Sequence, residues 1–248
     1  MAFAESPKSC RFTRYKGEGE KPDHRIKIEG IICKVINDSF PELLKLKIKL
    51  KETSNDQFYM FSRFNANRVI LGKKKGYVVI YNPKVFSKDK PTPPLALESI
   101  IAHELSHTFD YTKKSRFGLL FMIRHFLGKK ALARYERRID LETILRGYTQ
   151  AKDAADRFRY FDGLAQYRHW VYGMIPPETL EKKKLSYFRP EEFDILKKVV
   201  MVYGTDAIDY LRKNWKGKEV PLTLQESHKA VTKMIMALGD KKLQRVMP

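Results

Sequence analysis

Long apolar segments are missing from this chain of 248 residues. No apolar run approaches the ~20 residues that a membrane-spanning helix needs, and the best candidate, 118–126, is interrupted by Arg124 and His125. The first residues also lack the apolar core that is typical of a secretory signal. We therefore expect a soluble, cytoplasmic protein; delivery into another cell by specialised secretion is the alternative.

Cysteine, glycine and proline are also scarce. The two cysteines, Cys10 and Cys33, can form neither a zinc ribbon nor a disulfide framework, and they favour a reducing compartment. With 13 glycines and 12 prolines, the chain is neither collagen-like nor dominated by linkers. Hydrophobic residues make up 43% of the chain, which is enough to bury a core, so a globular protein is expected.

Acidic residues are outnumbered by basic ones. The chain has 49 lysines and arginines but only 29 aspartates and glutamates, and its formal net charge is +20. Such a charge attracts anionic partners but does not determine a fold. It leaves three classes of function open: a nucleic-acid binder, a membrane-surface binder and an enzyme with an acidic substrate.

The first part of the chain has the pattern of a small sheet. Residues 1–22 include the sequence GEGEKP and are expected to form a flexible N-terminal arm. Over 44–51, leucine or isoleucine alternates strictly with lysine, which predicts a strand with one buried face and four lysines in solvent. Two more short strands are predicted at 68–71 and 77–81, with a turn over 73–76 between them.

Helices predominate in the rest of the chain. Helical periodicity begins at Leu95, after a loop over 88–94. The sequence PEEF at 190–193 predicts another helix start, because proline suits the first turn and glutamates favour its positive end. The order of a sheet followed by helices predicts an α+β fold, with a single domain over 23–248 whose C-terminal part, from about 150, is mostly helical.

An HExxH motif, His-Glu-Leu-Ser-His, occupies residues 103–107 of the predicted helix. Apolar residues recur every four positions from Leu97 to Phe109, and they lie about 200° of helical rotation from the histidines. His103 and His107 are one turn apart and can share one metal ion. Glu104 projects beside them and can reach a metal-bound water without being a ligand. The alternative is a buried helix whose histidines are merely hydrogen-bonded.

A catalytic zinc ion takes three protein ligands and one water, so a third ligand is needed. Asp110 lies about 10.5 Å from His103 along an unbroken helix, which is too far for two ligands of one ion. Glu136 and Asp140 share one face of a later helix, whereas Glu142 points elsewhere. The alternative for this later helix is a charged surface on which the acids pair with nearby arginines.

The pattern of HExxH followed by ExxxD on a second helix resembles the gluzincin branch of the zincin metallopeptidases. The stretches ERRIDLETILRGY and KKLSYFRPEEF are also similar to uncharacterised bacterial HExxH proteins, and the likeness covers about residues 60–195. It implies a zincin-like fold, in which a small twisted mixed sheet packs on the HExxH helix. It also implies one Zn²⁺ per chain, held by His103, His107 and Glu136, with Asp140 orienting a ligand histidine from the second shell.

This resemblance implies a zinc-dependent metallopeptidase acting on a protein or peptide. A zinc-bound water has its pKa lowered toward ~7, and Glu104 would take its proton and pass it to the leaving amine. A donor to the developing oxyanion is expected from a later segment, and the candidates are Tyr148, His169 and Tyr172. In minimal zincins an edge strand binds extended peptide by backbone pairing; the sequence leaves open whether that edge is 68–71 or 77–81.

Two further questions concern the basic residues. If Arg137 and Arg138 border the cleft, an acidic substrate is favoured; the alternative is that they are solvated. The competing function is a basic module that binds nucleic acid or anionic membrane and keeps a structural or vestigial metal site. Nucleic acid is not expected as a partner, because the lysines are scattered and no nucleic-acid motif is present.

Overall fold

The computed structural model describes residues 9–15, 20–55, 59–73, 76–88, 92–125, 128–148, 188 and 190–246. The first elements are β1 (Arg11–Phe12), α1 (Asp23–Ser39), η1 (Pro41–Leu43), β2 (Lys47–Glu52), β3 (Met60–Phe64), α2 (Ala66–Ile70), β4 (Tyr77–Tyr81), η2 (Pro83–Phe86) and α3 (Pro94–Lys113). They are followed by α4 (Arg116–His125), α5 (Lys129–Thr143), η3 (Ile144–Tyr148), α9 (Pro190–Tyr203), α10 (Thr205–Asn214), η5 (Gly217–Glu219) and α11 (Leu224–Val246). The predicted α+β class is confirmed. The predicted order of a sheet followed by helices holds only from α3 onward, because α1 precedes β2 and α2 lies between β3 and β4.

Among the described residues, four strands form one mixed sheet in the order β1-β2-β4-β3. The pairs β1–β2 and β2–β4 are parallel, and β3 at one edge is antiparallel to β4. The backbone N–H groups of Asn65 and Asn82 donate to the carbonyls of Gly76 and Tyr59. In an antiparallel pair, every second residue is hydrogen-bonded to the partner strand. Residues 59 and 65 are bonded in this way, so Ser62 falls on a non-bonded position, and its backbone N–H and C=O point away from β4 toward the open edge.

The strand predicted over 44–51 is confirmed as β2, although it begins at Lys47. Its apolar residues Ile48 and Leu50 are buried in the core. The four alternating lysines, at 45, 47, 49 and 51, are exposed, as the period-2 pattern predicts. The strand predicted over 77–81 is confirmed as β4, and the helix predicted from Leu95 is confirmed as α3.

The strand predicted over 68–71 is wrong, because these residues belong to helix α2 and its end. The side chain of Asn65 accepts a hydrogen bond from the backbone N–H of Arg68 and caps the helix. The chain leaves helix α2 at Gly72, whose φ of 68° is a backbone conformation that glycine adopts readily. The neighbouring strand β3 was not predicted.

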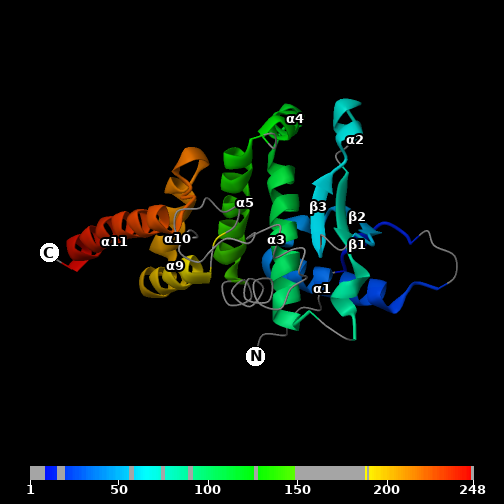
Figure 1. Ribbon diagram of the computed structural model, residues 1–248, viewed down its shortest axis with the longest axis horizontal. Helices are drawn as coiled ribbons and strands as arrows, with labels where there is room; N and C mark the ends of the chain where they lie inside the picture. The colour runs from blue at the N-terminus through cyan, green and yellow to red at the C-terminus, as the bar shows by residue number, and fades with distance from the viewer. Residues whose placement is uncertain are drawn as a thin grey trace, which may run out of the picture.

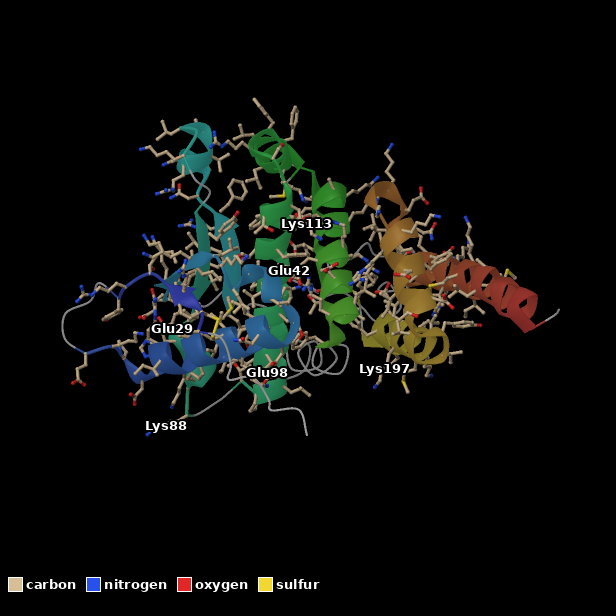
Figure 2. The ribbon with its side chains drawn as sticks, turned by 180° about the vertical axis from the view of Figure 1, so that it is seen from behind. Glu29, Glu42, Lys88, Glu98, Lys113 and Lys197 are labelled. Atoms are coloured by element: carbon tan, nitrogen blue, oxygen red, sulfur yellow. A yellow bond between two sulfur atoms is a disulfide. The ribbon has the colours of Figure 1, made fainter. Side chains whose placement is uncertain are left out.

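Part of the segment expected as an arm joins the sheet. Arg11 and Phe12 form β1, whose register places them opposite Lys47 and Ile48 of β2. Cys10 and Cys33 form a disulfide with a Cα–Cα distance of 5.6 Å, which ties β1 to α1 (Figure 2). Disulfides persist in oxidising surroundings, so this pairing runs against the reducing compartment that the scarcity of cysteine favoured.

The helices α3 and α5 stand side by side between the sheet and a helical layer formed by α9, α10 and α11 (Figure 1). One core cluster joins α1, the sheet and α3, and a second joins α5 to α9, α10 and α11. The guanidinium of Arg137, on α5, is fully buried, pairs with Glu192 of α9 and lies 4.2 Å from the ring centroid of Phe188. Within the described part of the chain, no helix is both long and apolar enough to cross a membrane.

Candidate metal centre

The HExxH residues lie in the middle of α3, where the helix is buried on all sides. The rings of His103 and His107 are one turn apart, with centroids 4.9 Å from each other and an interplanar angle of 79°. Both histidines and Glu104 are buried. Apolar residues of the same helix, including Ile101, Leu105 and Phe109, pack into the core shared with α1 and the sheet. The two imidazoles lie against Glu136 of α5.

Helix α5 supplies the carboxylate. One oxygen of Glu136, Oε2, lies 3.4 Å from His103 Nε2 and 3.3 Å from His107 Nε2. One ligand atom from each of the three residues lies within 4.8 Å of the others. Two ligands bound tetrahedrally to zinc at ~2.1 Å lie ~3.4 Å apart. The three predicted ligands are therefore brought together at the spacing that one metal ion requires.

Asp140, the residue predicted to orient a ligand histidine, lies directly behind His103. The Nδ1–H of His103 donates to Asp140 Oδ1 at 2.8 Å, which leaves Nε2 to face Glu136. The other oxygen, Oδ2, accepts a hydrogen bond from the backbone N–H of Phe188 at 3.3 Å. Asp140 is fully buried. A carboxylate in this position fixes the ring orientation and makes a ligand histidine more basic.

The second histidine is held by a partner that the sequence did not reveal. His107 Nδ1 lies 3.1 Å from the hydroxyl of Tyr135, and that hydroxyl donates to Asp110 Oδ2 at 3.3 Å. The Tyr135 oxygen therefore accepts the Nδ1–H of His107. Asp110 is in turn paired with Arg138 at 2.6 Å and with Lys114. Asp110 is not one of the three clustered residues, but it contacts the centre through Tyr135.

The charges around the centre favour a bound cation. Burial alone would lower the pKa of His103, but its hydrogen bonds to Asp140 and Glu136 raise that pKa to about 9. Burial alone would raise the pKa of Glu136, but the two histidines lower it to about 2. The centre therefore keeps an ionised carboxylate beside a histidine that readily holds a positive charge, and a metal ion can replace the proton on His103.

Glu104 lies on the side of the histidines that faces the sheet. Thr108 is one turn further along the same face of α3, and its Oγ1 lies 2.7 Å from Ser62 Oγ of β3. Tyr111 lies on this side as well: its hydroxyl donates to the open-edge carbonyl of Ser62 at 3.4 Å. Its ring stacks on that of His107 with an interplanar angle of 27° and centroids 6.1 Å apart. The edge strand next to the metal centre is therefore β3, and neither of the two candidates from the sequence.

The remaining predicted residues have different outcomes. Tyr148 is buried in the core beside α1, where its hydroxyl is hydrogen-bonded to Ser39. His169 and Tyr172 lie outside the described residues. Arg137 is buried in its pair with Glu192, so it neither borders a cleft nor is solvated. Arg138 and Asp110 line a cavity of about 690 Å³, and none of His103, Glu104, His107 and Glu136 contributes to its lining.

Comparison with protein-family models, with curated proteins and with solved structures finds no match to this chain. The function must therefore be argued from the chemistry of the site. Two imidazole nitrogens and one carboxylate oxygen, each fixed by neighbouring groups, form a donor set that suits a catalytic zinc ion. This donor set fits the metal that the HExxH motif predicts.

Proposed function

We propose that this protein is a zinc-dependent metallopeptidase of the zincin type that hydrolyses peptide bonds with Glu104 as general base. The observation that carries the proposal is the convergence of His103, His107 and Glu136 from two helices. The glutamate of the same motif is buried beside the two histidines. Without a third ligand, the two histidines would not form a catalytic zinc site, and Glu104 would have no metal-bound water to deprotonate.

The residues divide the work as follows. His103, His107 and Glu136 would hold one zinc ion, which supplies a water of lowered pKa and polarises the scissile carbonyl. The carboxylate of Glu104 accepts a proton from the attacking water and returns it to the leaving nitrogen. Asp140 and Tyr135 keep Nε2 of each histidine directed at the metal by accepting the proton on Nδ1.

The position of the edge strand β3 supports the proposal that the substrate is a peptide. Its backbone groups at Ser62 do not pair with β4; the carbonyl accepts from the Tyr111 hydroxyl, and the N–H faces the edge. An extended chain can pair with such an edge. Tyr111 connects this edge to the metal centre, because it contacts both Ser62 and His107. A peptide lying along β3 would pass on the side of α3 that carries Glu104. The buried and paired state of Arg137 gives no support to a preference for acidic substrates.

Replacement of Glu104 by Gln tests the proposal. We expect the zinc content to stay near one per chain and cleavage of unfolded casein or of a mixed peptide library to fall at least about 100-fold, as general-base loss does. The matched control is Glu98→Gln on the same helix, whose carboxylate pairs with Lys34 at the surface. This control should keep full activity.

A structural metal site is the alternative outcome of the same experiment. In that case the wild-type protein would bind zinc but cleave neither casein nor the library, and Glu104→Gln would change nothing. Full activity in the Glu104→Gln variant would contradict the assigned mechanism. Absence of zinc from the wild type, when zinc is offered, would remove the proposal altogether.

A further inference from the structure

Two long segments of the chain contain no acidic residue. Residues 59–88 and 111–135 each carry seven lysines and arginines and no aspartate or glutamate. A chain with 29 acidic residues among 248 would be expected to place several of them in segments of this length. These two segments therefore carry a high local positive charge, and this charge plays no part in the metal centre.

The fold brings the two segments together at one end of the molecule. Helix α2 from the first segment contacts helix α4 from the second. Both views show these two helices side by side, beyond the ends of the sheet and of α3 (Figures 1 and 2). Their inner residues, Val69, Leu119 and Met122, pack into one small core cluster, so the end is held as a folded unit.

Helices α2 and α4 both expose large apolar side chains. Four large side chains, which we call the apolar tip, are largely exposed: Ile70 by 66%, Leu71 by 65%, Phe117 by 76% and Phe121 by 63%. Exposed basic residues lie on or next to the same helices, namely Arg68, Lys73, Arg116, Lys129 and Lys130. Large exposed apolar groups gathered at one place mark an interaction surface.

We propose that the apolar tip docks on the surface of an anionic lipid bilayer. Aromatic and aliphatic side chains that project together can enter the boundary between headgroups and acyl chains, while flanking lysines and arginines bind anionic headgroups. Nucleic acid explains the positive charge, but isoleucine and leucine contribute nothing to phosphate contacts. A lipid surface uses both the charge and the four apolar side chains, so it accounts for more of what this end displays.

The proposal does not rest on the metal centre, because none of its residues touches His103, His107 or Glu136. It predicts where the protein acts, not what it does. Its test is therefore the binding of the full-length protein to vesicles, measured by co-sedimentation with and without zinc. We expect binding to phosphatidylcholine vesicles that contain phosphatidylserine, little binding to pure phosphatidylcholine, and no dependence on zinc.

Two pairs of variants locate the contact. Phe117→Ser with Phe121→Ser removes the aromatic part of the tip and should weaken vesicle binding about tenfold or more. Its control, Met201→Ser with Val202→Ser, alters side chains that are 74% and 62% exposed on α9, and it should bind like the wild type. Arg68→Glu with Lys73→Glu should also weaken binding more than about tenfold, since each basic residue near the surface contributes.

The matched control for charge is Lys229→Glu with Lys233→Glu on α11, where both lysines are exposed. Equal weakening by this control would show that binding follows net charge alone and would overturn the proposal. Absence of binding to either vesicle would overturn it as well. The proposal would also be overturned if the protein bound RNA but not vesicles and the tip variants abolished the binding to RNA. That result would assign the tip to nucleic acid. All variants are exposed substitutions, and their thermal unfolding should match that of the wild type.

Discussion

Each histidine of the metal centre has its own partner behind the ring, and the two partners differ in charge. Asp140 is a buried carboxylate, whereas Tyr135 is a neutral hydroxyl that passes the contact on to Asp110. The carboxylate stabilises a proton on His103 directly, together with Glu136. In the metal-free protein, a proton therefore occupies Nε2 of His103, the atom that would bind the metal ion.

We predict that zinc binding to the metal-free protein at pH 7 releases about one proton. The pKa of His103 is about 9, in spite of burial, because Asp140 and Glu136 raise it. Below that pH the ring is protonated, and zinc must displace the proton from Nε2. The apparent affinity for zinc should therefore rise up to about tenfold per pH unit and level off above pH 9. Calorimetric titration in buffers of different ionisation enthalpy measures the released proton.

Asp140→Asn provides the variant for this prediction. It removes the charge that raises the pKa of His103, so less proton is released at pH 7. Above pH 9, where no proton competes for Nε2, zinc affinity should fall about 10–100-fold. The control is Asp209→Asn on α10, which is exposed and should change neither quantity. Proton release that is the same in Asp140→Asn as in the wild type would contradict the role given to this carboxylate.

The same residues show how far a site can be predicted from sequence. The two histidines share one helix, as do Glu136 and Asp140, so i and i+4 spacing is enough to place each pair on one face. The contact from Tyr135 to Asp110 depends on how α5 is rotated against α3, and no local pattern reports that rotation. Tyr135 directly precedes Glu136, and this adjacency was its one available signal.

At the scale of elements, a local sequence pattern predicts the secondary structure correctly where only one structure fits the pattern. The alternation in β2 is strict, and its four lysines are exposed. The segment 68–71, with three apolar residues after Arg68, is as suitable for a strand as for a helix, and the Asn65 cap decides in favour of α2. Strand β3 is short and contains Ser62 and Arg63, so its pairing with β4 comes from tertiary contacts and not from a pattern.

The helical layer beyond α5 is attached through a buried ion pair. Arg137 and Glu192 are both almost completely buried, and the hydroxyl of Ser227 on α11 completes the group. We predict that Glu192→Gln lowers the free energy of unfolding by about 3–5 kcal/mol, because it removes the carboxylate that pairs directly with the buried guanidinium. Guanidinium chloride unfolding, followed by circular dichroism, gives this free energy.

Glu191→Gln is the control for this ion pair. Glu191 is the exposed neighbour in the first turn of α9, and its charge interacts with the helix N-terminus. Its loss should cost no more than about 1 kcal/mol. A Glu192→Gln variant as stable as Glu191→Gln would show that the pair contributes nothing to the attachment of α9 to α5.

At the scale of the whole molecule, the sheet has two edges with different surroundings. Strand β3 forms one edge, next to α3 and the metal centre, and β1 forms the other. The disulfide between Cys10 and Cys33 closes the β1 edge against α1. A change at the β1 edge should therefore affect stability without reaching the metal centre.

We predict that reduction of the disulfide lowers the free energy of unfolding by about 3 kcal/mol, as expected for a cross-link across a sequence separation of 23 residues. Zinc affinity should stay unchanged, because β2 and β4 lie between β1 and β3. Denaturant unfolding with and without reductant measures the first quantity, and chelator competition measures the second. Cys10→Ser should match the reduced wild type in both. Two titratable thiols in the air-oxidised, unfolded protein would contradict the pairing and would restore the expectation of a reducing compartment.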